Sequence, residues 1–296
     1  MKKILCFSLF LLFTHFFCNA EINFTFSLAP HIGLTYGQFD EILYDTTGKE
    51  CSLLEWEQKP LLNFGLSAEI TINRLLISSG FEYGLQIGTP VMHDSDWDDG
   101  TKYSYTTHPL KTSKEINTQL LIAYRLYSDY IISIIPEIDL QYMYNTFNAG
   151  EGSGTRYKRQ IRVYGVDYSR HTFLIFTGLS LSTKIKQAFT LTTGILVSPY
   201  TYQYGFDYHH GVKHPFTSIG IQESFFSKIK IKSELAFACT DRFSLILNST
   251  ILFGNTDKGL FYSDYYTDNI TLCTDQKTGA KLWSAKIGLA TKFKIF

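Results

Sequence analysis

Residues 24–37 read Phe-Thr-Phe-Ser-Leu-Ala-Pro-His-Ile-Gly-Leu-Thr-Tyr-Gly, and large apolar residues occupy every second position over most of this stretch. Because successive side chains of a β-strand point to opposite faces, this period of two predicts a strand with one apolar and one polar face. The apolar phase contains Phe24, Phe26, Leu28, Ile32, Leu34 and Tyr36. The other phase contains Thr25, Ser27, His31, Gly33, Thr35 and Gly37.

The same alternation recurs along the chain. The 20 tyrosines and 24 phenylalanines are spread singly at alternate positions instead of forming apolar blocks. This distribution suits a sheet that has lipid on one side and water on the other. Several alternating segments reach or exceed the ~9–11 residues that a tilted strand needs to cross a bilayer. The clearest of them are residues 62–72, 77–88, 116–126, 132–142 and 228–237.

Long and short connections alternate between these segments. Outer-membrane barrels have this asymmetry, with short periplasmic turns and long extracellular loops. We therefore predict an all-β fold for residues 21–296, a single antiparallel transmembrane β-barrel of about ten strands. No run of 18 apolar residues follows the N-terminal leader, which excludes a helical membrane protein. The long connections cover residues 38–50, 89–112, 148–166 and 254–280, and the short ones lie at 73–74, 128–129, 184–186 and 240–242.

The N-terminus has the form of a secretory signal peptide. Two lysines precede an apolar run at residues 4–17, and Cys18-Asn19-Ala20 follows it. We predict that residues 1–20 are a signal peptide, cleaved after Ala20, and that the mature barrel lies in the bacterial outer membrane. A lipoprotein anchor at Cys18 is the weaker alternative, because bulky residues occupy positions 15–17.

Charge and cysteine content exclude some classes of protein. The chain has 27 Lys and Arg against 27 Asp and Glu, so it has no basic field for binding nucleic acid. After the leader only Cys51, Cys239 and Cys273 remain, an odd number without the spacing of metal ligands. Neither a disulfide framework nor a cysteine-based metal site is expected.

Two polar motifs far apart in the sequence could do chemistry together. Residues 91–100 read Val-Met-His-Asp-Ser-Asp-Trp-Asp-Asp-Gly, and residues 207–210 read Asp-Tyr-His-His. Asp94 and Asp96 are two residues apart, as are Asp207 and His209, and such pairs share one face of a strand. If both pairs lie at one rim, Asp207 fixes the tautomer of His209, whose free nitrogen takes a proton from water. The opposite carboxyls would hold that water and stabilise the oxyanion, so the site could hydrolyse amides without a nucleophilic side chain.

These motifs resemble the two halves of the active site of the omptins, outer-membrane endoproteases on a ten-stranded barrel. The resemblance spans essentially the whole mature chain, in the same order and spacing. Its parts are Asp94-Ser95-Asp96-Trp97, Asp207-Tyr208-His209, Leu54-Glu55-Trp56, Glu41-Ile42-Leu43-Tyr44 and His108-Pro109.

The resemblance implies a role for each matching residue. Asp207 and His209 would be the dyad that activates water, and Asp94 and Asp96 the opposing couple. Glu41 would line the pocket for a basic side chain before the scissile bond. The second acid of that pocket falls on Gly205 here, so a weakened or shifted preference is expected.

The resemblance also implies the surroundings of the reaction. The substrates would be extracellular peptides or proteins, cleaved at a site that faces outward, and the barrel would be a monomer. No metal or cofactor is expected, although family members need lipopolysaccharide, an outer-membrane lipid, for activity. No basic cluster in the sequence identifies where that lipid would bind.

Other interpretations of the same residues remain open. Residues 94–99 could be a solvated or calcium-binding loop, although they lack the glycine and terminal glutamate of an EF-hand. Ser104 with His108 could form a serine hydrolase, but no orienting acid is defined. A non-enzymatic adhesin or small pore with an acidic rim is the main alternative to the protease. A lipid hydrolase would need a membrane-facing serine beside a histidine, and the sequence offers no such pair. A zinc site could use Asp207, His209, His210 and His214.

Overall fold

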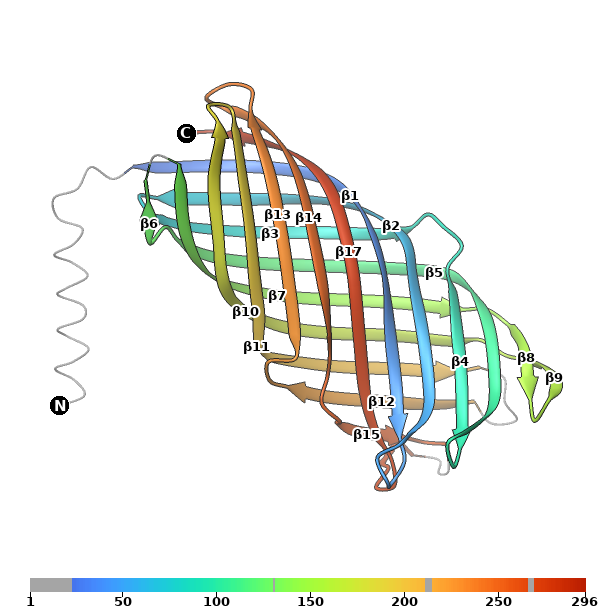
Figure 1. Cartoon of the computed structure of the whole chain (residues 1–296). Helices are drawn as coiled ribbons and strands as arrows, with labels where there is room; N and C mark the ends of the chain where they lie inside the picture. Colours follow the sequence, from blue (N-terminus) through green and yellow to red (C-terminus); the bar gives the residue numbers. More distant parts are fainter. Residues whose placement is uncertain (1–22, 130, 211–214, 266–268) are drawn as a thin grey trace, which may run out of the picture.

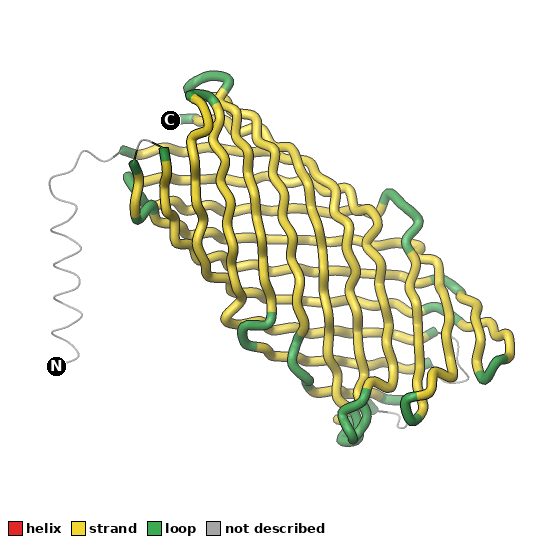
Figure 2. Tube along the Cα trace, viewed as in Figure 1, coloured by secondary structure: helices red, strands yellow, loops and turns green. Residues whose placement is uncertain are grey.

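The computed structural model describes residues 23–129, 131–210, 215–265 and 269–296. The predicted signal peptide, residues 1–20, lies outside these ranges. Within them the regular structure is all β, seventeen strands in one sheet (Figures 1 and 2). No described helix is long and apolar enough to span a membrane.

The ten longest strands are β1 (Phe24–Tyr44), β2 (Glu50–Ile72), β3 (Leu75–Gln86), β5 (Thr101–Tyr124), β7 (Ile132–Ala149), β10 (Val166–Lys186), β11 (Phe189–His209), β13 (Lys228–Ala238), β14 (Phe243–Asn255) and β17 (Lys277–Lys294). The others are β4 (Val91–Asp98), β6 (Tyr127–Ser128), β8 (Gly152–Arg156), β9 (Arg159–Val163), β12 (Phe216–Ser224), β15 (Leu260–Ser263) and β16 (Thr271–Leu272).

The ten longest strands close into a ring. Each pairs antiparallel with the next, in the order β1, β2, β3, β5, β7, β10, β11, β13, β14 and β17. The ring closes where β17 pairs with β1, from Ser27↔Lys294 to Tyr44↔Lys277. The ring of ten strands leaves no free sheet edge, so the predicted all-β antiparallel barrel is confirmed, although the sheet has seventeen strands in all where about ten were predicted.

Several segments predicted to be loops are instead strands that continue beyond the membrane. The prediction for residues 38–50 is wrong, because β1 runs to Tyr44 and β2 begins at Glu50. Residues 89–112 form most of the β4–β5 hairpin, and residues 148–166 contain the β8–β9 hairpin. The strict alternation ends there because the outer face of the sheet no longer meets lipid, whereas the backbone pairing continues. The connections stay asymmetric, since β4, β8, β9 and β15 lie at the end opposite to β6 and the C-terminus (Figure 1).

The two faces of the barrel wall differ as the alternation predicts. Large apolar side chains such as Ile32, Phe64 and Leu179 are exposed on the outside. Charged pairs join strands across the inside: Lys230 to Asp139 at 2.5 Å, Lys232 to Glu137, Lys286 to Glu82 and Lys292 to Glu69. Each pair links strands that are not neighbours in the ring, so the side chains fill the interior and neutralise one another.

Aromatic rings close the interior below the outer end of the barrel. Trp56 stacks on Tyr168 with ring centroids 5.2 Å apart, and Phe147 lies 5.3 Å from Trp56. Phe39 stacks on the same tyrosine at 5.6 Å. All four residues are buried, and they form a rigid apolar layer, which we call the aromatic floor.

Candidate active site

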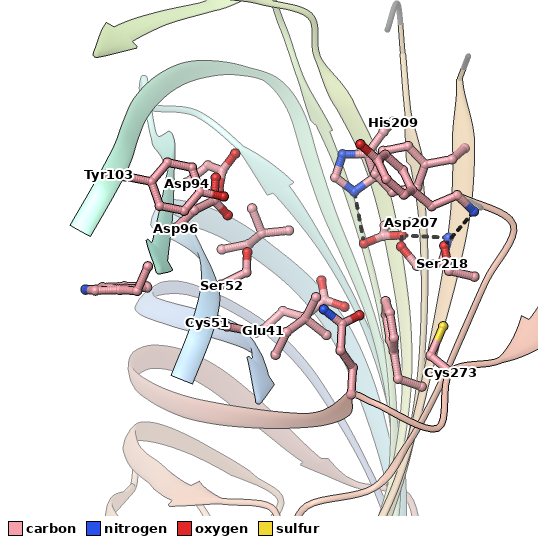
Figure 3. Close-up of a pocket in the computed structure, with 18 residues that line it drawn as sticks. Glu41, Cys51, Ser52, Asp94, Asp96, Tyr103, Asp207, His209, Ser218 and Cys273 are labelled. Carbon is pink, nitrogen blue, oxygen red and sulfur yellow. Dashed lines mark hydrogen bonds and ion pairs between the residues drawn. The ribbon is translucent and has the colours of Figure 1, made fainter. Parts of the chain in front are cut away.

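A cavity of about 420 Å³ lies above the aromatic floor at the outer end of the barrel. Its lining residues come from β1, β2, β4, β5, β11, β12 and β15, together with the segment that leads into β17. It is lined by all five residues that the sequence predicts for a site: Glu41, Asp94, Asp96, Asp207 and His209. Figure 3 shows the two aspartates of β4 on one wall and the Asp207–His209 pair on the facing wall. The barrel therefore brings together motifs more than a hundred residues apart.

Strand β11 carries the first pair. Nε2 of His209 lies 3.4 Å from Oδ2 of Asp207, so the carboxylate holds one side of the imidazole. Figure 3 shows the other ring nitrogen directed into the cavity. The backbone N–H of Ser218 on β12 donates to Oδ1 of Asp207 at 3.0 Å, and its hydroxyl donates to the same oxygen. Phe216 stacks on the His209 ring at 4.1 Å, which fixes the plane of the imidazole.

Strand β4 carries the opposing couple. Asp94 and Asp96 pair in register with Leu54 and Ser52 of β2, so both side chains leave the same face of the strand. Ser95 between them is buried on the other face, where it accepts a hydrogen bond from Lys102 at 3.1 Å. Neighbouring strands on both sides thus prevent β4 from rotating the couple away from the cavity.

The charges in the cavity shift one another's protonation. Burial and the neighbouring Asp96 raise the pKa of Asp94 to about 7, against the opposing charges of His209 and Arg156. Burial also raises the pKa of Asp96, although hydrogen bonds from Ser52 and Ser104 oppose the shift. The couple therefore keeps one proton close to neutral pH, as two adjacent carboxyls do.

The pKa of His209 shifts in the direction opposite to the effect of burial. Burial alone would lower the pKa of His209, but the charge and hydrogen bond of Asp207 and the carboxyls of β4 outweigh it. The net effect raises that pKa above its usual value. A raised pKa makes the neutral imidazole a stronger base for taking a proton from water.

Glu41 lies at the bottom of the cavity. Its side chain is buried, and Oε2 has no hydrogen-bond partner among the described residues. Burial and Asp207 raise the pKa of this carboxyl well above its usual range, although Arg170 opposes them. Gly205 does not line the cavity, because it faces the ring of Tyr168 in the aromatic floor.

Other sequence interpretations have a structural outcome. His108 is buried, and its ring contacts Thr106 at 3.0 Å and donates to the carbonyl of Gly150 at 2.9 Å. Both ring nitrogens are therefore engaged with residues other than Ser104, which argues against a Ser104–His108 hydrolase pair. His210 pairs with Asp167 at 2.8 Å and does not line the cavity. Across the described ranges no cluster of histidine, cysteine or acidic residues could hold a metal ion, and His214 lies outside them.

Sequence reasoning missed the residues that support the site. Ser218, Phe216 and Arg156 lie near the four central side chains but belong to other strands, and nothing in their local sequence marks them. Only the register between β11 and β12, in which Asp207 opposes Ser218 and His209 opposes Phe216, brings two of them there.

Comparison with known proteins identifies the family of this chain. The model of the Omptin family matches residues 22–294, nearly the entire chain. The chain belongs to the omptin family. This omptin is thus an outer-membrane β-barrel of bacteria, as the sequence predicts. No curated protein matches it.

The comparison with solved structures gives one match that shows a likeness in fold and one much weaker match. The outer membrane protease OmpT from Escherichia coli superimposes with a TM-score of 0.81 at 15% identity, covering 94% of this chain and 99% of OmpT. The translocator domain of the autotransporter NalP from Neisseria meningitidis gives a TM-score of 0.39 at 9% identity, covering 98% of this chain and 95% of NalP. The OmpT match supports the overall fold of the omptin barrel.

Proposed function

We propose that this omptin is an outer-membrane endopeptidase that hydrolyses peptide bonds with a water molecule activated by His209. One observation carries the proposal: the Asp207–His209 pair and the Asp94–Asp96 couple occupy facing walls of a single cavity of about 420 Å³. In a barrel that only bound cations or host proteins, these two pairs would have no reason to converge. The OmpT structure, which is that of an outer membrane protease, supports the same assignment.

The geometry suggests a role for each side chain. Asp207, held by Ser218, would orient His209 and stabilise the imidazolium that forms. The nitrogen directed into the cavity would take a proton from water as the oxygen attacks the peptide carbonyl. The protonated member of the Asp94–Asp96 couple would donate a hydrogen bond to the developing oxyanion. His209 would then return its proton to the leaving amine, so that no covalent intermediate forms.

Substrates would reach this cavity from outside the cell. The long strand extensions that carry the site lie at one end of the barrel, and such extensions face outward in outer-membrane barrels. The substrates would be extracellular peptides or proteins, with Glu41 at the position that contacts the side chain before the cut. We propose a monomer that uses no metal or cofactor and is activated by lipopolysaccharide.

A peptide library tests the proposal directly. The refolded barrel is incubated with a mixed peptide library, with and without lipopolysaccharide, beside His209→Ala and Asp94→Ala. We expect the wild type to cleave, lipopolysaccharide to raise the rate, and both variants to lose about 10²–10⁴-fold in rate. His210→Ala is the matched control, because that histidine pairs with Asp167 outside the cavity. An inert wild type, or a His209→Ala barrel that cleaves as well, would refute the proposal.

A small pore fits the structure less well. The ion pairs across the interior and the aromatic floor occupy the space that a channel would need. The void next to these ion pairs is only about 130 Å³. The refolded barrel should therefore show no steady conductance in a planar bilayer.

A further inference from the structure

We infer that the cavity accepts an uncharged side chain before the scissile bond instead of lysine or arginine, and that Tyr168 and Arg170 determine this preference. The inference rests on the endopeptidase function proposed above and specifies its substrate class. It departs from the basic preference that the resemblance to omptins implies, and it is carried by the residues that surround Gly205.

Tyr168 occupies the space that an acidic side chain at position 205 would need. Gly205 and Asp207 are two residues apart on β11, so both positions face the interior. A Cβ atom on Gly205 would lie 2.8 Å from the hydroxyl oxygen of Tyr168 and 3.3 Å from its Cε2 atom. Tyr168 is held in place by its stacking in the aromatic floor and is only 3% exposed. Position 205 therefore adds no carboxyl beside Glu41, and the nearby carboxyl of Asp207 is already engaged by Ser218 and His209.

Arg170 adds a positive charge behind that end of the cavity. It pairs in register with Gly205, is 1% exposed, and its guanidinium carbon lies 3.4 Å from the centre of the Phe39 ring. Its Nη2 donates to Oδ1 of Asn145 at 3.0 Å, and within the described ranges it makes no ion pair with a carboxylate. Arg170 therefore balances, from behind, any negative charge that Glu41 carries.

The remaining lining favours the same class of side chain. Leu43, Leu54, Phe216 and Phe261 supply the apolar part of a lining that also contains the carboxyls of Glu41, Asp94, Asp96 and Asp207. Burial raises the pKa of Glu41 well above its usual range, so the group resists ionisation. A lysine or arginine bound there would lose its hydration without gaining a full counter-charge, which is costly. An uncharged side chain meets no such penalty.

Matched peptides test this preference. A set of peptides varies only the residue before the cut, among lysine, arginine, glutamine and leucine, and kcat/KM is measured for the refolded barrel with lipopolysaccharide. The wild type should cleave the better of the uncharged peptides at least about tenfold faster than either basic one. In the double variant Tyr168→Ala/Gly205→Asp, the ratio should move toward the basic peptides by at least about tenfold, because a second carboxyl then has room.

Tyr168→Phe provides the control. It keeps the ring that fills the space and should keep the wild-type preference. A wild type that cleaves after lysine or arginine as fast as after uncharged residues would overturn this inference and leave the endopeptidase function standing. So would a folded double variant with an unchanged ratio. A wild type that cleaves none of these peptides, nor any in a mixed library, would overturn both.

Discussion

Asp207 on β11 and Ser218 on β12 are joined by two hydrogen bonds to one carboxylate oxygen, one from the backbone N–H at 3.0 Å and one from the hydroxyl. The other oxygen of the carboxylate is left for His209. Ser218 thus fixes which edge of the Asp207 carboxylate faces the imidazole, and in the proposed reaction it would act only through Asp207.

This arrangement predicts the effect of Ser218→Ala. The variant keeps the backbone hydrogen bond and loses the one from the hydroxyl, so Asp207 should hold His209 less firmly. Because a hydrogen bond to a charged group contributes about 1.5–3 kcal/mol, kcat should fall about 10- to 100-fold. Steady-state kinetics should show KM nearly unchanged, and Ser218→Thr, which retains a hydroxyl, should recover part of the loss. A change confined to KM would contradict the positioning role.

The Asp207–His209 pair should behave as one unit. His209→Ala and Asp207→Asn should each reduce kcat by about 10²–10⁴-fold, because either change removes an oriented base. The double variant should be little worse than the poorer single variant, since the second change removes a residue that has already lost its function. Single-turnover measurements on the four proteins would test this, and strictly additive losses would show that the residues act separately.

Activity should depend on pH as a narrow bell near neutrality. In the proposed mechanism the neutral imidazole of His209 is the active form, so the rate should rise with pH through a pKa that its neighbours raise above the usual value. The same mechanism needs the proton of the opposing couple, so the rate should fall as Asp94 ionises at about 7. Measuring kcat/KM against pH tests both limbs.

Replacing Asp96 should shift the pH dependence of activity. Asp96 raises the pKa of both Asp94 and His209, so Asp96→Asn should shift both limbs to lower pH and reduce the maximum rate. Asp98→Asn, an exposed residue of the same strand, is the control. A profile that shifts to higher pH in Asp96→Asn would contradict the assignment of the couple.

The interior ion pairs predict how single and double substitutions change the free energy of unfolding. Lys230 and Asp139 are both buried and lie 2.5 Å apart, so Asp139→Leu alone would leave a buried, unpaired ammonium group. The free energy of unfolding should fall by about 3–5 kcal/mol in that variant. The double variant Lys230→Met/Asp139→Leu should recover most of the loss. Urea unfolding of the barrel in lipid vesicles measures both, and equal destabilisation of the two variants would argue against a pairing role.

Much of this molecule can be predicted from local sequence. The period of two predicts the strands that cross the membrane because lipid and the filled interior impose opposite demands on the two faces of the wall. Asp94 with Asp96, and Asp207 with His209, can be recognised because a spacing of two puts both side chains on one face. The resemblance to omptins then supplies what spacing cannot, namely that the two pairs meet.

What lies beyond the membrane could not be predicted in the same way. The upper parts of β1 and β2 have no lipid on their outer face, so no strict alternation of apolar and polar residues marks residues 38–44 as strand. Ser218 and Tyr168 depend on the register between strands, which no local pattern contains. Gly205 could be recognised as a departure from the family, but the ring that replaces the missing acid could be identified only in three dimensions.

The extension of the strands beyond the membrane has one more consequence. The four central side chains lie on continuously hydrogen-bonded sheet, as part of β4 and β11, and not on flexible loops. Moving either wall would break a row of backbone hydrogen bonds, so the groups are preorganised and reorder little during a reaction. The same stiffness prevents the walls from wrapping around a compact domain. Only a chain segment that is already extended and unstructured can slide between them, so conformational disorder in the target, as much as its sequence, would decide where it is cut.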